Sequence, residues 1–288
     1  MNAAGAWKFS DGLLLSALIA LALVVTLAPW KDVAYLAWNV EEQSHILLGL
    51  PVALWLGWVR RDRLRYAPPH RTLLGPLVIA AGWVISRWGY LNGTELAWHG
   101  GALLVVFGAV LSVVGLEFVR QFAPSFAGLL FLIPVPGRIR HMIAMPLQEI
   151  SAKISEFFLM IFEVPVEREG NVLRIAGHEV AIAEACNGMR MVAALALVAF
   201  AFVYTVPMRS SVRLLILAIS PLVALVVNVV RLVPTALLYG YSDKHTADVF
   251  HDLSGWGVLL LALGMLWGFV AVLRWIEVPI APYAVAED

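Results

Sequence analysis

The chain is poor in charged residues and in cysteine. Asp, Glu, Lys and Arg make up only 14% of its 288 residues, whereas a soluble domain carries about 25%. So few charges could not cover the surface of a water-soluble protein of this size, and they equally exclude a disordered chain and a coiled coil. The single cysteine, Cys186, excludes an internal disulfide. The 20 basic and 20 acidic residues balance, so no net field predicts nucleic-acid binding.

Several familiar signatures are also missing. The sequence has no internal repeat, no phosphate-binding loop, no dinucleotide glycine pattern and no zinc signature. The histidines other than His251 show no metal-ligand spacing with Cys186. We therefore expect neither a metal nor another cofactor.

Apolar residues, by contrast, make up 61% of the chain, and the mean hydropathy is +0.84. A spanning helix needs about 20 mostly apolar residues. The predicted fold is therefore an all-α polytopic membrane protein, a single integral membrane domain over residues 1–288 with about eight transmembrane helices. The predicted segments are Gly12–Ala28, His45–Val59, Leu73–Gly89, Ala102–Phe118, Phe122–Val135, Met189–Val206, Leu214–Val233 and Gly255–Trp275.

The arginines predict the orientation, because short cytoplasmic loops are enriched in Lys and Arg. The loop after the second segment carries five arginines between residues 60 and 71. Both termini are then cytoplasmic, the first segment is a retained anchor, and residues 138–185 lie outside. The segment Phe122–Val135 is short and ends in the Pro-Val-Pro of 134–136, which cannot continue as a helix. The sequence leaves open whether this segment spans the membrane or is re-entrant.

The predicted outer insert, residues 138–185, changes its periodicity along its length. Apolar residues recur at three- and four-residue spacing over 138–162, which predicts an amphipathic helix at the membrane surface or packed on other helices. Short strands around Val172–Ile175 and after His178, with turns at 170–171 and Gly177, predict a small β-hairpin that leads to Cys186. We divide the domain into a four-helix part, 1–120, and a second part, 121–276, that contains this insert.

Cys186 is the first residue that could carry chemistry. It lies in the run Glu184–Arg190, at the start of the sixth predicted segment. A helix N-terminus favours a thiolate, and Arg190, one turn further along the same face, would favour it too. Asn187 belongs to the same helix start. The alternative is a buried cysteine that acts as a small apolar residue.

Arg231 is the second candidate, near the predicted outer end of the seventh segment. An ionisable residue inside a membrane segment is unfavourable and usually marks function. Asn228 shares its helical face. The alternative is an arginine that extends its charge to the membrane interface.

His251 is the third candidate, at the predicted outer start of the eighth segment. A histidine can take and return a proton near neutral pH. The alternative is a surface histidine beside an N-capping Asp252 or Ser254. The predicted topology brings Cys186, Arg231 and His251 to one face of the membrane. A nucleophile, a cation and a base at one depth are what thiol-based acyl transfer requires.

Three ordered blocks of the sequence resemble the exosortase/archaeosortase family. The first is Glu184–Arg190, the second runs from Asn228 to Arg231, and the third runs from His251 to Trp256. Weaker similarity extends over 131–136, 146–148 and the turn at 170–171, so that the resemblance covers about half of the chain, 128–271. The first block reads Cys-Asn-Gly where Cys-Ser-Gly is more frequent in the family. This departure keeps the nucleophile and affects only the subfamily.

The resemblance implies a transpeptidase-like cysteine protease of the bacterial inner membrane. Its substrates would be envelope-destined proteins with a C-terminal sorting signal, formed by a Pro-Glu-Pro-type motif, a transmembrane helix and a basic cluster. Cys186 would be the nucleophile, Arg231 the arginine and His251 the histidine of the family's set. Asn228, Arg190, Asn187 and Asp252 would support them or bind substrate. Membrane lipid, and a polysaccharide or another envelope acceptor, would be further partners.

Two alternatives stand beside this interpretation. The chain could be a membrane scaffold or a transporter, with Arg87, Glu117 and Arg231 as charges along a pathway. It could also be a membrane acyltransferase with Cys186 as the acyl carrier.

Overall fold

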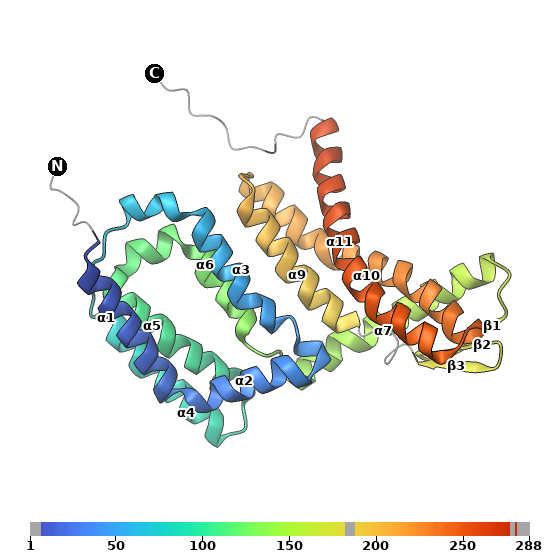
Figure 1. Ribbon diagram of the computed structural model, residues 1–288, viewed down its shortest axis with the longest axis horizontal. Helices are drawn as coiled ribbons and strands as arrows, with labels where there is room; N and C mark the ends of the chain where they lie inside the picture. The colour runs from blue at the N-terminus through green and yellow to red at the C-terminus, as the bar shows by residue number, and fades with distance from the viewer. Residues whose placement is uncertain (1–6, 182–187, 277–279, 281–288) are drawn as a thin grey trace. The chain divides into compact units, whose positions relative to one another are not determined.

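The computed structural model describes residues 7–181, 188–276 and 280, and the described chain is mostly helical (Figure 1). It divides into two compact units, Met1–Pro136 and Gly137–Asp288. The boundary follows the Pro-Val-Pro segment, where two prolines remove backbone donors and end the helical structure.

The first unit consists of helices. A pair of helices comes first, bent by 80° at Thr26. The longest helix, α5, carries Gly115 at φ 76°, so the helix is kinked there. After η3, the segment at 133–136 is held by Gln43, whose amide donates to the carbonyl of Val135 at 2.9 Å and accepts from its N–H at 3.2 Å. The elements are α1 (Phe9–Val25), α2 (Leu27–Asn39), η1 (Glu41–Gln43), α3 (Ile46–Val59), η2 (Arg61–Tyr66), α4 (Leu74–Leu91), α5 (Glu95–Gln121), α6 (Ala123–Gly128) and η3 (Leu129–Leu132).

Helices α4 and α5 pack side by side through glycines (Figure 1). Small residues at a membrane helix interface let backbones approach closely. A Cβ on Gly101 would lie 2.3 Å from the backbone nitrogen of Ser86, and one on Gly82 would lie 2.8 Å from that of Val105. The glycines recur every seven residues on both helices, a period that keeps one seam in contact. They lie at positions 75, 82 and 89 of α4 and at 101 and 108 of α5, and Gly115, seven residues further, approaches His70 ahead of α4.

The described part of the second unit contains four helices and a small sheet. The core between α9, α10 and α11 is apolar, with Leu195, Ile216 and Leu266 fully enclosed. The elements are α7 (Gly137–Ile161), β1 (Val166–Glu169), β2 (Val172–Ile175), β3 (His178–Ala181), α9 (Gly188–Thr205), α10 (Ser210–Tyr241) and α11 (Lys244–Trp275).

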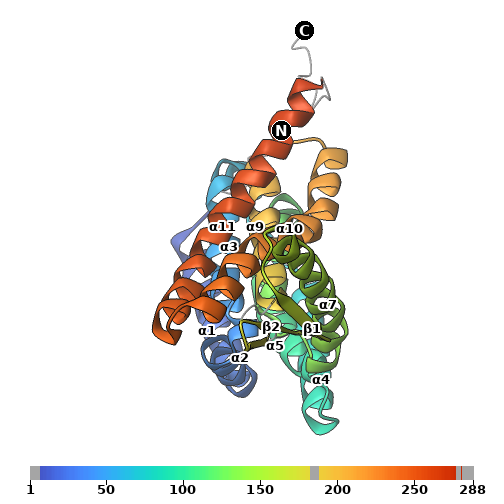
Figure 2. The same cartoon turned by 90° about the vertical axis from the view of Figure 1, so that its right-hand side faces the viewer.

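The sheet is antiparallel in the order β1-β2-β3, so the predicted hairpin of β2 and β3 gains a third strand (Figure 2). Successive side chains of a strand point to opposite faces. Leu173 and Ile175 therefore share one face, and together with Val180 they pack on Leu159 of α7 and Leu232 of α10. This apolar contact fixes the sheet against the two helices.

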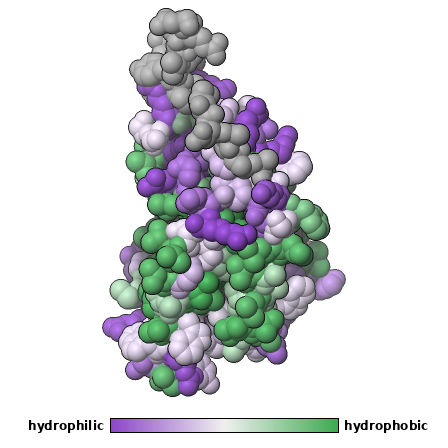
Figure 3. All heavy atoms as spheres, turned by 90° about the vertical axis from the view of Figure 1, so that its left-hand side faces the viewer, coloured by the Kyte–Doolittle hydropathy of each residue, from purple (hydrophilic) through white to green (hydrophobic). Residues whose placement is uncertain are grey.

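The described residues contain three helices long and apolar enough to cross a membrane, namely α5, α10 and α11. The number rises to five if α1 with α2, and the pair Ala123–Leu132 and Gly137–Ile161, each count as one span. Apolar side chains also form a broad band on the face drawn in Figure 3. These features agree with a multi-pass membrane protein. The predicted segment Phe122–Val135 is interrupted, because only α6 and η3 are helical within it.

Candidate functional site

The candidate site lies on α10 and α11, which extend beyond the predicted apolar segments. Each helix has 32 residues, or about 48 Å at 1.5 Å per residue, against about 30 Å for the hydrocarbon core. Arg231 and His251 therefore lie inside helices, not at their ends as predicted. Helix α10 continues past Pro234 to Tyr241, and α11 begins at Lys244.

Asp243 is the N-cap of α11, so this helix begins ahead of the predicted segment. Its carboxylate accepts hydrogen bonds from the backbone N–H and the hydroxyl of Thr246, both at 2.8 Å. These bonds hold the pKa of Asp243 below its ordinary value. The prediction of Asp252 or Ser254 as the cap is therefore wrong, because α11 begins at Lys244 and Asp243 accepts from the N–H of Thr246 in its first turn.

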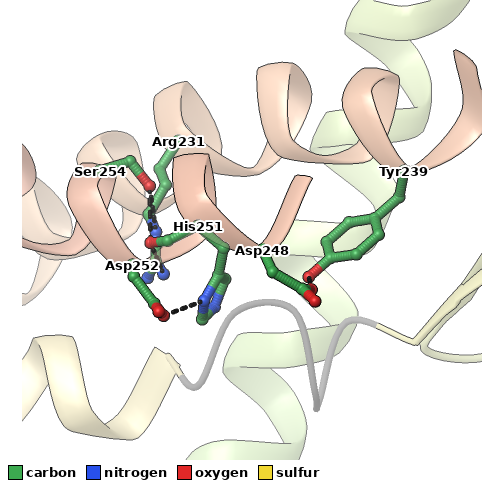
Figure 4. A network of polar contacts seen from close by, with 6 residues as sticks. All are labelled: Arg231, Tyr239, Asp248, His251, Asp252 and Ser254. Atoms are coloured by element: carbon green, nitrogen blue, oxygen red, sulfur yellow. Dashed lines mark hydrogen bonds and ion pairs between the residues drawn. The ribbon is translucent and has the colours of Figure 1, made fainter. Parts of the chain in front are cut away.

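Arg231 is buried and connects the two helices (Figure 4). Its Nε donates to the hydroxyl of Ser254 at 3.0 Å, and its Nη2 donates to the carbonyl of His251, also at 3.0 Å. The Ser254 hydroxyl donates in turn to the same carbonyl at 3.0 Å. On its own helix, the Arg231 carbonyl accepts from Thr235 at 2.8 Å. The planar guanidinium uses its fork to hold the main chain of α11 at the candidate histidine.

The His251 ring has one contact to a neighbouring side chain among the described residues. Its Nδ1 lies 3.2 Å from a carboxylate oxygen of the exposed Asp252, while its Nε2 is closed to solvent and has no hydrogen-bond partner in the described part of the chain. Asp248 lies one turn earlier on the same helix face and accepts from the Tyr239 hydroxyl at 2.7 Å. Asp248 and Asp252 thus precede and follow His251 in the sequence. Figure 4 shows the Tyr239 phenol directed at Asp248.

Asn228 points to a different helix. It is 4% exposed, and its amide donates to Ser151 of α7 at 3.1 Å. The amide oxygen of Asn228 and the hydroxyl of Ser155, one turn beyond Ser151, are buried without a partner among the described residues. The periodicity alone could not reveal Ser151 and Ser155, since they read as spacers of an amphipathic helix.

Cys186 and Asn187 lie outside the described residues, as does the side chain of Arg190. Helix α9 begins at Gly188. The structure thus brings together Arg231 and His251, with Asp252 beside the histidine and Asn228 one turn away from the arginine. The role of Cys186 stays a prediction.

The other ionisable residues proposed for a pathway face outward. Arg87 is exposed and lies over the Tyr90 ring, 5.6 Å from its centre. Glu117 is half-exposed and contacts Arg120 and Gln121, its own helical neighbours. Neither has a cross-bundle ion pair in the described chain.

The outer face of the sheet carries charges. Arg174 contacts the carboxylates of Glu179 and Glu167, and chiefly the hydrogen bond to Glu179 raises the pKa of Arg174 above its ordinary value. These residues line an open cavity of about 370 Å³. No group of three or more His, Cys, Asp and Glu that could hold a metal ion occurs among the described residues.

Comparison with known families matches residues 38–268 of the chain to the transmembrane exosortases. Neither the curated proteins nor the solved structures give a match. The matched region covers more than half of the chain and includes both Arg231 and His251. The chain belongs to the transmembrane exosortase family.

Proposed function

We propose that the protein is a membrane-embedded cysteine protease and transpeptidase. It cleaves the C-terminal sorting signal of envelope or secreted proteins and transfers some of them to an acceptor such as a polysaccharide. The observation that supports this most directly is the buried Arg231 fork, which fixes His251 through its main chain. A guanidinium and an imidazole held together at one depth suit the stabilisation of an oxyanion and the transfer of a proton.

The lengths of the two helices support an extracytoplasmic site. Arg231 is about 32 Å along α10 from Ser210, and His251 is about 36 Å along α11 from Trp275, at 1.5 Å per residue. The basic residues at those far ends, Arg209 and Arg274, mark the cytoplasmic side. Both site residues then lie at the opposite interface of a core about 30 Å thick. We propose this arrangement together with eight spans in the inner membrane and with both termini in the cytoplasm.

The proposed reaction has two steps. The Cys186 thiolate attacks the scissile carbonyl, Arg231 stabilises the oxyanion, and the C–N bond breaks while His251 protonates the leaving amine. The product is a thioester between the substrate and Cys186. Water, or an amine or hydroxyl of the acceptor, then loses a proton to His251 and attacks the thioester, which releases the thiolate. Water gives hydrolysis, and an acceptor amine or hydroxyl gives transfer.

The test uses a reporter protein that ends in a Pro-Glu-Pro motif, a transmembrane helix and a basic cluster. We expect the wild-type protein to shorten this reporter and Cys186→Ala to leave it intact while inserting normally into the membrane. Mass spectrometry of trapped protein should find a peptide on Cys186. Normal processing by Cys186→Ala would refute the mechanism.

The same mass measurement separates the alternatives. A fatty-acyl adduct on Cys186 would indicate an acyltransferase. Full function after alkylation of the thiol from outside would indicate a scaffold or a transporter. The exposed positions of Arg87 and Glu117 favour the protease, because pathway charges normally face the bundle interior.

A further inference from the structure

Helix α7 carries buried polar groups that the proposed reaction does not use. Ser151 and Ser155 are one turn apart on the same face, and they are 1% and 0% exposed. Asn228 of α10 contacts this face through its bond to Ser151. The three side chains form a neutral polar group between α7 and α10, one turn from Arg231.

Two atoms of this group have no partner. The hydroxyl of Ser155 and the amide oxygen of Asn228 are both closed to solvent, and the described chain offers neither of them a hydrogen bond. Buried polar atoms are nearly always bonded, because an unmet donor or acceptor destabilises the fold. A pair of unmet atoms beside a catalytic arginine indicates that a ligand supplies the missing bonds.

The chemistry of the group identifies the ligand class. A hydroxyl can donate and accept, and an amide oxygen accepts. Neither is charged, so together they match the N–H and C=O groups of a polypeptide main chain. A charged headgroup would need a countercharge, and none of the three side chains of this group carries one.

The contact between α7 and α10 can open at this level. The buried residues of α7 are small, Ala144, Ser151, Ala152 and Ser155, with Leu159 the only large one among those described. Separating small side chains exposes little apolar area, and the free energy of separation scales with that area. Leu159, near the C-terminal end of α7, keeps that end in contact with the sheet and α10.

We propose that Ser155 and Asn228 bind main-chain peptide groups of the substrate next to the cleaved bond, and that Ser151 holds Asn228 in position. This inference rests on the proposed protease function. The substrate segment inserts between α7 and α10 and satisfies both atoms. It thereby places the scissile carbonyl beside Arg231.

The test compares two serines of one helix face. Ser155→Ala removes a hydroxyl that has no partner, so the melting temperature in detergent should stay the same or rise. Cleavage of the reporter should show KM raised about fivefold, the effect of one neutral hydrogen bond, with kcat within about twofold. Ser151→Ala leaves the Asn228 amide without its acceptor and should lower the melting temperature. Ser220→Ala, which loses only a bond to the Leu217 carbonyl on its own helix, is the control and should leave KM unchanged.

A melting temperature that does not fall, together with a raised KM for Ser155→Ala, distinguishes substrate binding from a structural role. A lower melting temperature for Ser155→Ala, or an unchanged KM, would overturn the inference while Cys186-dependent cleavage by the wild type persists. Absence of that cleavage would overturn the proposed function and this inference with it.

Discussion

Replacement of Arg231 by lysine tests whether the fork or only the charge is required. Arginine uses two nitrogens here, one on Ser254 and one on the His251 carbonyl, each at 3.0 Å. Lysine has one ammonium and cannot occupy both nitrogen positions. A hydrogen bond from a charged donor is worth about 1.5–3 kcal/mol, and Arg231 is only 8% exposed, so water replaces the lost bond poorly.

The expected loss follows from that free energy. At about 1.4 kcal/mol per factor of ten, Arg231→Lys should slow single-turnover cleavage of the reporter by about 10- to 100-fold. The melting temperature should fall as well, because α10 loses one of its bonds to α11.

Ser254→Ala is the matched control. It removes one acceptor of Arg231 but keeps the guanidinium and its bond to the His251 carbonyl. The melting temperature should then fall about as much as in Arg231→Lys, because one bond of the charged donor is lost in each variant. Cleavage should fall less than in Arg231→Lys, because the guanidinium itself stays at the site. Near-native cleavage by Arg231→Lys would show that charge alone suffices. Equal losses of cleavage in both variants would show that Arg231 acts only as a structural link.

Two further predictions concern stability. Gly101→Ala should destabilise the α4–α5 pair by about 2–3 kcal/mol in detergent unfolding, because its Cβ would lie 2.3 Å from a backbone nitrogen. The neighbouring Gly100→Ala, whose Cβ would meet only a side-chain atom at 3.8 Å, should be neutral or slightly stabilising, and equal unfolding of the two variants would contradict the close packing. Asp243 has a folded pKa below its unfolded value, so its contribution is present above the unfolded pKa and is lost as the pH falls through the folded pKa. Asp243→Asn should therefore flatten the loss of melting temperature below about pH 4, and an unchanged acid profile would refute this.

Hydropathy located the helices but not all of their ends. Most predicted segments coincide with helices. Gly12–Ala28 crosses the bend at Thr26 between α1 and α2, and within Phe122–Val135 α6 and η3 give way to the Pro-Val-Pro segment. Hydropathy marks the part of a helix that lies in lipid. It did not mark the polar first turns of α11, which depend on the Asp243 cap and on the Tyr239–Asp248 bond.

The amphipathic helix over 138–162 is confirmed as α7, but its polar positions were harder to interpret. Ser151 and Asn228 are 77 residues apart in the chain. Their contact depends on how α7 packs against α10, which no local pattern encodes. The seven-residue glycine repeat of α4 and α5, in contrast, was present in the sequence and could have predicted their close packing.

Under the proposed mechanism, the geometry around His251 allows an arginine and a histidine to act at one site. A guanidinium bonded to the imidazole itself would compete for a ring nitrogen and repel the protonated ring. Arg231 instead binds the main-chain carbonyl of His251, and Ser254 binds the same oxygen. The position of the residue is thus fixed through its backbone, while Nδ1 faces Asp252 and Nε2 is left without a partner in the described chain. In the proposed mechanism the ring can therefore change its protonation without breaking the bonds to its main-chain carbonyl, which a residue serving alternately as acid and base requires.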